Sequence, residues 1–475
     1  MTLPPAHYIA PGDARAERRI LLVSPAYPPC AEVGALRWEK ITDVAAERGW
    51  GLDVITGAAG PLDRIDERRL LTLPAGTRVW TIPMPVPMLQ RVERGVVAMV
   101  APLRRRKRAA ASEGATREGG NGATMTAAMP GALPLPSPDG ATAPVSAMMR
   151  NMRAASYFTA WLEWGEAVVE LARELAREHR PAVVASSGPP HMTHEAARRV
   201  AHAIGRRLAI DLRDPWFVSE AEPDELRGTT WRRRSAAYEA RACADASLVV
   251  VNTESCAELM RERYPQFASK VTTVMNGADD EVRAFSDTSG DTFDIVHTGN
   301  VYGGRDPRPL FRGIARFLER AGDAAGAVRV RFVGAQRYEG VPLEDMARES
   351  GLGDRFSCTP PMTRPEALRL SGRAAVNVVL QQDWTHSIPS KVFEYMQFPA
   401  WILALAQPGD AISQLLGGST SPPLSPQDTD AIADFLATRF ERWSRGERDA
   451  PFNADGRFDR KRQAGRLLDA LEALA

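Results

Sequence analysis

The residues best suited to chemistry lie in the stretch Ile388–Pro399, I-P-S-K-V-F-E-Y-M-Q-F-P. Pro389 suits the first turn of a helix, and the amides of Ser390 and Lys391 would then face an anion in the preceding loop. Lys391 and Glu394 are three residues apart and share a helix face, which offers a cation for phosphate and a carboxylate for two ribose hydroxyls. The alternative is a capped amphipathic helix with a Lys391–Glu394 ion pair.

A second candidate is the glycine-rich loop T-G-N-V-Y-G-G-R-D at Thr298–Asp306, which directly follows a strand-like run. Backbone amides in such a loop can form an anion-binding concavity, to which Asn300 and Gly303 would belong and Arg305 would add charge. A surface turn is the alternative. The chain has no G-x-x-x-x-G-K-[ST] motif, which argues against a P-loop nucleotidase.

In the first half of the chain, Gly34 and Arg37 come after the buried-strand run Arg19–Ser24. The loop after the first strand of a doubly wound sheet faces the ligand crevice, so Gly34 would let the backbone approach a phosphate and Arg37 would supply charge. The alternative reading of Gly34 is an ordinary turn.

The string D-L-R-D-P-W begins at Asp211 and also follows a strand. Two carboxylates could form an acid/base pair, but their spacing around Arg213 favours an ion-paired turn. We expect Arg213 and Asp214 to shape the crevice and Asp211 to contact a substrate on the acceptor side of the crevice.

A D-x-D string at Asp428–Asp430 precedes a helical pattern, which favours helix capping over a metal site. Lys391, Arg305 and a helix start would hold the negative charge of a phosphate ligand, so we expect neither a metal nor another cofactor.

The elements that must position these residues alternate between strand and helix, which predicts an α/β fold with parallel sheets. A first series runs from about residue 19, and a second opens at Asp294–His297. The predicted domains are residues 19–285 and 292–455, followed by a C-terminal helix at 456–475.

At three motifs the chain resembles the nucleotide-sugar glycosyltransferases of family 4. These are P-S-K-V-F-E-Y from Pro389, the S-G-P-P-H-M-T-H loop that ends at His194, and D-L-R-D-P-W from Asp211. The resemblance extends from about Arg19 to Asp410 and is interrupted by one insert. It implies the GT-B architecture, two Rossmann-like doubly wound domains facing a central cleft, and retaining transfer of a sugar from a nucleotide diphosphate sugar.

The resemblance also assigns residues. His194 matches the family's histidine, expected to bind a hydroxyl of the donor sugar or the acceptor, and Arg305 joins Lys391 on the diphosphate. Many family members have an E-x7-E pair whose second glutamate matches Glu394, but His386 stands where the first would be. Whether His386 replaces it stays open, as do two alternatives: a nucleotide-sugar epimerase and a non-catalytic binding protein.

Composition bounds the partners and the compartment. Lys and Arg total 60 against 59 for Asp and Glu, and the net charge of +1 argues against nucleic-acid binding. The four cysteines lack metal-ligand spacing, which suggests a reducing compartment. Without a signal peptide or a membrane-spanning run, a cytoplasmic protein is expected.

The insert Ala109–Ser146 is rich in small and polar residues and predicts disorder. The basic run Arg104–Arg108 follows an apolar stretch and predicts peripheral contact with an anionic membrane at its inner face. The family's frequent role in surface polysaccharide assembly suggests a lipid-linked glycan as acceptor. The alternative to membrane contact is that Arg104–Arg108 is simply a solvated basic run.

Overall fold

The computed structural model describes residues 6–10, 16, 18–31, 33–58, 65–84, 86–89, 146–217, 225–287, 290–301, 303, 305–334, 336–382 and 385–475. The basic run Arg104–Arg108 and the insert Ala109–Ser146, apart from Ser146 itself, lie outside these residues. The chain divides into two compact units, Met1–Val250 with Leu468–Ala475, and Val251–Leu467. The sequence places this boundary later, between residues 285 and 292.

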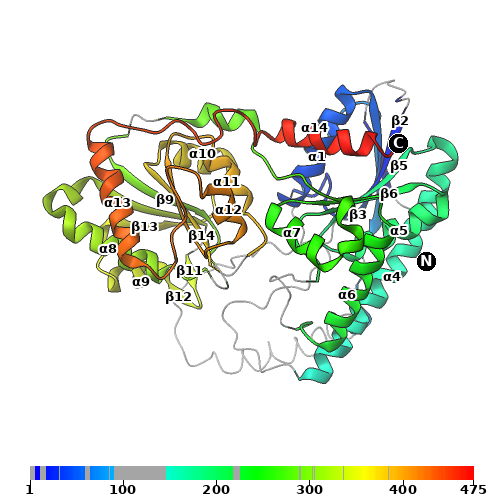
Figure 1. Cartoon of the computed structure of the whole chain (residues 1–475), viewed down its shortest axis with the longest axis horizontal. Helices are drawn as coiled ribbons and strands as arrows, with labels where there is room; N and C mark the ends of the chain where they lie inside the picture. Colours follow the sequence, from blue (N-terminus) through cyan, green and yellow to red (C-terminus); the bar gives the residue numbers. More distant parts are fainter. Residues whose placement is uncertain are drawn as a thin grey trace, which may run out of the picture. The chain divides into compact units, whose positions relative to one another are not determined.

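The first sheet has eight strands in the order β1-β4-β3-β2-β5-β6-β7-β8. Figure 1 labels β2, β3, β5 and β6 of this sheet. Their bounds are β1 Ala6–Ile9, β2 Arg18–Val23, β3 Trp50–Ala58, β4 Thr77–Pro83, β5 Val183–Gly188, β6 Arg207–Leu212, β7 Leu248–Val251 and β8 Val271–Thr273. The pairs β4-β3, β3-β2, β2-β5 and β5-β6 are parallel, and β1 pairs with β4 in the antiparallel sense. The helices of the first unit are α1 Val33–Glu47, α2 Arg68–Leu71, α4 Ala147–His179, α5 Met192–Ile204 and α6 Thr229–Asp245.

Helix α4 is 33 residues long and begins at Ala147. Its first turn is capped by the Ser146 side chain, which accepts a hydrogen bond from the Met149 amide. Large side chains such as Phe158, Trp161 and Trp164 are buried along one face of α4. The start of the helix is therefore set by a local cap and its position by aromatic packing.

The second sheet has five strands, all parallel, in the order β13-β10-β9-β14-β15. Their bounds are β9 Phe293–Gly299, β10 Val328–Gly334, β13 Phe356–Thr359, β14 Val376–Gln381 and β15 Trp401–Ala406, and a small hairpin pairs β11 Arg337–Tyr338 with β12 Val341–Pro342. The helices of this unit are α7 Glu254–Arg263, α8 Arg308–Ala321, α9 Leu343–Glu349, α10 Arg364–Arg373, α11 Ser390–Tyr395, α12 Ala411–Leu416 and α13 Thr429–Ser444. The fold class predicted from the sequence is thus confirmed.

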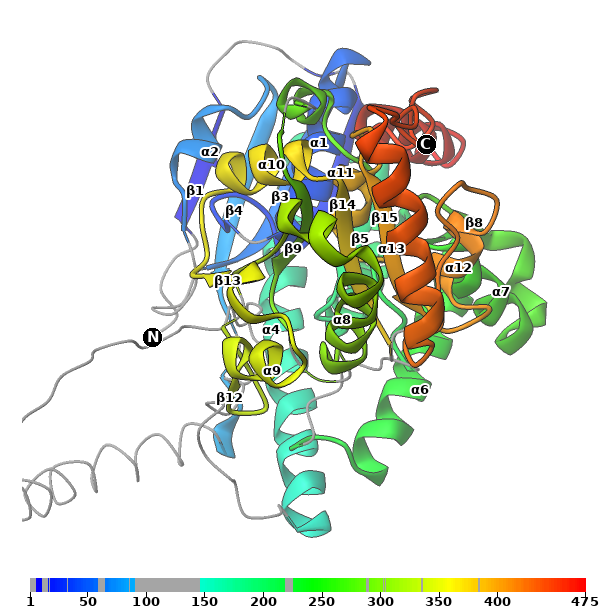
Figure 2. The ribbon, with the colours of Figure 1, turned by 90° about the vertical axis from the view of Figure 1, so that its left-hand side faces the viewer.

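Both faces of the second sheet are covered, because successive side chains of a strand point to opposite faces. Val378 and Leu380 pack into a core with residues of α8, α9 and α13. Figure 2 shows α8 and α13 in front of the strands of this sheet. Val379, between them, packs into a second core with residues of α11 and α12. Strands buried on both sides explain the continuous apolar runs in the sequence.

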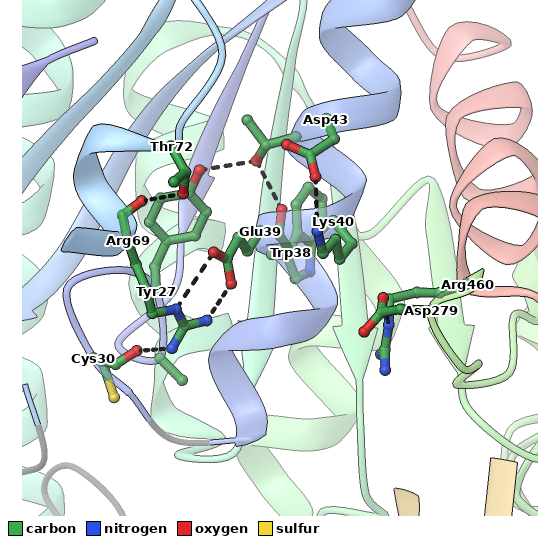
Figure 3. A network of polar contacts seen from close by, with 12 residues as sticks. Tyr27, Cys30, Trp38, Glu39, Lys40, Asp43, Arg69, Thr72, Asp279 and Arg460 are labelled. Carbon is green, nitrogen blue, oxygen red and sulfur yellow. Dashed lines mark hydrogen bonds and ion pairs between the residues drawn. The ribbon is translucent and has the colours of Figure 1, made fainter. Parts of the chain in front are cut away.

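A polar network fixes the chain between β2 and α1 (Figure 3). Arg69 of α2 pairs with Glu39 of α1, and its Nη1 donates to the Cys30 carbonyl at 2.6 Å. The Tyr27 hydroxyl lies 2.9 Å from that of Thr42 on α1. The segment that leads to Gly34 is therefore held from two sides.

The last helix, α14 (Arg460–Glu472), is divided between the two units, and its end belongs to the first. Arg48 Nη1 donates to Asp469 at 2.6 Å, and Trp50 Nε1 donates to Glu472 at 3.2 Å. The first unit is therefore built from two pieces of chain that are far apart in the sequence. None of the described helices is both long and apolar enough to cross a membrane.

A buried ion pair joins β2 to β3. Arg19 Nε and Nη2 each donate to the Asp53 carboxylate at 2.7 Å, and Nη2 also donates to the Gly76 carbonyl ahead of β4 at 2.9 Å. The Arg19 and Asp53 side chains are only 7% and 1% exposed. One guanidinium therefore ties three segments of the first unit together.

We predict that Asp53→Ala lowers the free energy of unfolding of the first unit by about 3–5 kcal/mol, because the buried Arg19 charge loses its partner. Denaturant unfolding followed by tryptophan fluorescence measures the change. Lys40→Ala is the matched control, since the Lys40–Asp43 pair is 36% and 37% exposed and worth at most about 1 kcal/mol. Equal losses in the two variants would contradict the prediction.

Candidate functional site

Lys391 lies in the first turn of α11, two residues after Pro389, which is the N-cap residue of the helix rather than part of its first turn. Its ammonium donates to the Thr298 carbonyl at 2.7 Å and lies 3.4 Å from His297 Nε2. Both partners are at the carboxyl end of β9, the edge of a parallel sheet where ligands bind in doubly wound folds. The motif helix and the glycine-rich loop are thus brought together through this lysine.

Arg305 is the second cation of this region and is 8% exposed. Burial, together with the positive charge of Arg305, lowers the pKa of Lys391 to about 7, although Glu394 acts in the opposite direction. Two cations close enough to repel one another at a partly buried position favour the binding of an anion. This arrangement supports the predicted pairing of Arg305 with Lys391.

The glycine-rich loop that carries Arg305 adopts backbone conformations that glycine permits. Gly299 has φ +110° and Gly303 has φ +56°, a region that other residues rarely adopt. A Cβ on Gly299 would lie 3.4 Å from Lys391 Nζ. Asn300 is exposed just after β9, and the Gly303 carbonyl accepts a hydrogen bond from Tyr338 at 2.9 Å.

Glu394 pairs with Arg364 and not with Lys391, so the ion pair of the alternative sequence interpretation is not formed. Its Oε1 accepts hydrogen bonds from Arg364 Nε at 3.0 Å and Nη2 at 2.8 Å. Arg364, the first residue of α10, also donates to Asp279 at 3.2 Å, and Asp279 accepts from Arg460 at 2.8 Å. A planar guanidinium whose Nε and Nη2 both donate to one carboxylate oxygen is a better partner than a flexible ammonium one turn away.

This arrangement leaves Glu394 Oε2 with no hydrogen bond to any described residue, and the side chain is 22% exposed. The carboxylate is therefore oriented by Arg364 through one of its two oxygens. Ser390 is partly buried at the start of the same helix.

His386 is held by two residues at the start of α7. Its Nδ1 lies 2.6 Å from the Ser255 hydroxyl, and its carbonyl accepts from the Thr253 hydroxyl at 2.6 Å. The ring is partly buried. Its orientation is thus set by contacts that no motif in the sequence indicates.

In the first unit, Asp211 lies at the end of β6 and is 2% exposed. Its carboxylate accepts from Arg37 Nε and Nη2, both at 3.0 Å, from Trp38 Nε1 at 2.8 Å and from the Ser187 hydroxyl at 3.1 Å. Arg37, itself buried, thus meets Asp211 in a bidentate pair that joins α1 to the strand ends. Both residues are brought to the predicted edge of the sheet, and this geometry favours a structural contribution.

His194 lies in the first turn of α5 and is completely buried. Its Nδ1 is 2.9 Å from the Ser186 hydroxyl, and its Nε2 has no hydrogen-bond partner among the described residues. Burial and the nearby Arg213 charge lower the pKa of His194 to about 3, so the imidazole is neutral. A Cβ on Gly188 would lie only 2.7 Å from Nε2, so the backbone approaches this nitrogen closely.

Gly34 has a different neighbour from the phosphate that the sequence suggests. A Cβ at Gly34 would lie 2.1 Å from Arg213 Nη1, so the absent side chain makes room for a guanidinium. Arg213 also donates to the Pro189 carbonyl in the loop that leads to His194. Burial raises the pKa of Asp214 to about 6 although Arg213 opposes the shift. Gly34, Arg213 and His194 therefore belong to one cluster in the first unit.

The D-x-D string has the capping role that we expected. Asp428 is the N-cap of α13, and its side chain accepts from the Ala431 amide at 2.9 Å. Two residues of the candidate site, His297 and Arg364, were missed by the sequence interpretation. His297 stands at the end of a buried strand beside the glycine-rich loop, a position that could have indicated it, whereas Arg364 belongs to no recognisable motif.

Each of the two units is a Rossmann-like α/β unit built on a mostly parallel sheet, and the fold is GT-B. The chain is similar to sucrose-phosphate synthase from Thermosynechococcus elongatus, with a TM-score of 0.56, 14% identity, and 97% and 100% of the two chains covered. Similarity to a glycosyltransferase from Rickettsia africae gives a TM-score of 0.57 at 10% identity, over 96% and 98%. For HepE from Anabaena, in complex with UDP and glucose, the TM-score is 0.55 at 13% identity, over 96% and 100%.

No family model matches the sequence, and no curated protein does. At these identities, the likeness to solved structures is a likeness of fold.

We predict that sulfate binds the second unit through Lys391 and that its affinity falls above pH 7. Sulfate stays a dianion throughout, but Lys391, with a pKa of about 7, must regain its proton to bind it. The loss is at most about tenfold per pH unit. Lys391→Arg keeps a fixed charge and should bind sulfate without this slope, whereas Lys391→Met should bind weakly at every pH. Titrations followed by thermal shift from pH 6 to 9 measure it, and a wild-type affinity independent of pH would contradict it.

Proposed function

We propose that the protein is a glycosyltransferase that moves a sugar from a nucleoside diphosphate sugar to an acceptor hydroxyl. The observation that carries the proposal is Lys391 at the end of β9, where it donates to the Thr298 carbonyl and where the positive charge of Arg305 helps to lower its pKa. A diphosphate supplies the charge that these two cations would neutralise, and preorganised cations stabilise it as it departs. Glu394, oriented by Arg364 beside them, suits the hydroxyls of a ribose.

In the proposed step, the bond between the anomeric carbon and the diphosphate oxygen breaks, and its electron pair leaves with the diphosphate. A bond forms from the acceptor oxygen to the anomeric carbon, and the acceptor proton is released. Lys391 and Arg305 stabilise the leaving group, so no metal or other cofactor is required. The resemblance to glycosyltransferase family 4 supports retention of the anomeric configuration.

The proposed donor is a UDP-hexose, which is supported by the complex of HepE with UDP and glucose. The proposed acceptor is a lipid-linked glycan of surface polysaccharide assembly. The protein would then be cytoplasmic and in peripheral contact with an anionic membrane, and the basic run Arg104–Arg108 supports that placement.

Two histidines are proposed to contact the sugar substrates. Ser255 holds His386 through Nδ1, which leaves Nε2 to replace the glutamate that the family has at this position. His194 offers the Nε2 atom that lacks a partner in the described part of the chain. Asp211 holds Arg37, and we propose that it acts on the acceptor side through that arginine.

The proposal is tested by incubating the protein with UDP-glucose and other nucleotide sugars, without acceptor, and measuring free sugar and UDP. A donor at ~100 times its Kd should raise the free energy of unfolding by about 2.7 kcal/mol, which thermal shift detects. We expect slow donor hydrolysis, with His194→Ala lowering turnover more than donor affinity. Ser186→Ala is the matched control, because it removes only the partner of His194 Nδ1. Binding without turnover would indicate a non-catalytic protein, and an altered sugar an epimerase.

We predict that Glu394→Ala weakens UDP binding by about thirty- to thousand-fold, or ~2–4 kcal/mol, because ribose hydroxyls lose a charged acceptor. Glu394→Gln should be milder, since the amide keeps the shape and one acceptor. Pyrophosphate, which has no ribose, is the control ligand and should bind both variants like the wild type. Stability should change little, because the Arg364 side chain is 42% exposed and the pair is worth at most about 1 kcal/mol. Unchanged UDP affinity in Glu394→Ala would make Glu394 a structural residue.

A further inference from the structure

His297 is a buried histidine that the proposed chemistry does not use directly. It lies on β9 with none of its surface exposed, and its ring packs 4.9 Å from that of Phe332. Its Nδ1 lies 3.1 Å from the carbonyl oxygen of Val378 on the neighbouring strand β14. A carbonyl oxygen can only accept, so Nδ1 carries the proton.

The other ring nitrogen is therefore determined as well. Burial, with the charges of Lys391 and Arg305, lowers the pKa of His297 well below its ordinary value, so the imidazole is neutral. A neutral ring protonated at Nδ1 has a lone pair at Nε2. Nε2, which carries this lone pair, lies 3.4 Å from Lys391 Nζ, so the histidine accepts a hydrogen bond and the lysine donates it.

The ammonium of Lys391 has three N–H groups. One donates to the Thr298 carbonyl at 2.7 Å and one is directed at His297 Nε2, which leaves one. Glu394, the nearest candidate for that last group on the same helix, is bound to Arg364 instead. A lysine side chain is a flexible stem with a point charge, so two fixed acceptors determine where its remaining N–H is directed.

We propose that His297 is a positioning residue that accepts a hydrogen bond from Lys391 at Nε2 and so directs the remaining ammonium N–H to a phosphate oxygen of the donor. The proposal rests on the proposed function, because the nucleoside diphosphate is the ligand that this N–H would meet. It explains why an acceptor is placed beside a cation that already lies near the positive charge of Arg305. The backbone bond to Val378 fixes which nitrogen faces the lysine.

Two substitutions separate the two contacts of this ring. In His297→Gln the side-chain oxygen can reach the place of Nε2 and still accept from Lys391. In His297→Asn the shorter amide can still donate to the Val378 carbonyl but leaves Lys391 without its second acceptor. Both amides are neutral and lose the ring contact with Phe332, so their effects on folding should be similar.

UDP binding to the full chain is measured by calorimetry from pH 6.5 to 9, in buffers of different ionisation enthalpy that report proton uptake. The wild type should take up a proton at pH 8 as Lys391 becomes charged. We expect His297→Asn to bind UDP about tenfold more weakly and to lose affinity at lower pH than the wild type. His297→Gln should stay within about threefold of the wild type and keep its pH profile.

Equal affinities and pH profiles in both variants and the wild type, with only melting temperatures lowered, would overturn the proposal and make His297 a packing residue. The same titrations with sulfate separate this inference from the proposed function. If UDP fails to bind the wild type while sulfate binds with the expected difference between the Asn and Gln variants, the proposed function fails and the role of His297 stands. If sulfate binds all three proteins alike, the role of His297 fails.

Discussion

The candidate site depends on one electrostatic constraint, the repulsion between two cations that share a partly buried position. Burial already disfavours a charged Lys391, and Arg305 adds to that cost, as the lowered pKa of about 7 expresses. Such a site is at its least favourable when nothing negative is present. The neighbouring residues hold the ammonium without neutralising it, since Thr298 and His297 offer only neutral acceptors. The free energy of this repulsion is therefore available to an anion that binds.

In the first unit, by contrast, a buried negative charge is bound by several hydrogen-bond donors. Asp211 is surrounded by donors from Arg37, Trp38 and Ser187, so its charge is held firmly in the interior. His194 in the same region is neutral and keeps one nitrogen without a described partner. The two units thus place different chemistry at the carboxyl ends of their strands: a cationic site in the second, and in the first a rigid charged pair beside a neutral imidazole.

Much of the fold was predictable because strands such as β2, β14 and β15 are buried on both faces and read as nearly continuous apolar runs. Lys391 was predictable because a proline, a helix start and a loop lie within a few residues. The partner of Glu394 was not, since Arg364 lies 30 residues away and wins by its planar geometry rather than by sequence spacing. Gly34 was found for its place after a strand, but the guanidinium of Arg213 that fills the space comes from a distant segment.

The placement of the end of α14 has a consequence for how the chain matures during synthesis. Arg48 and Trp50 have their partners, Asp469 and Glu472, 421 and 422 residues later in the chain. During synthesis, both side chains therefore lack these partners until the end of α14 has been made. A chain that stops before α14 would expose this part of the surface of its first unit.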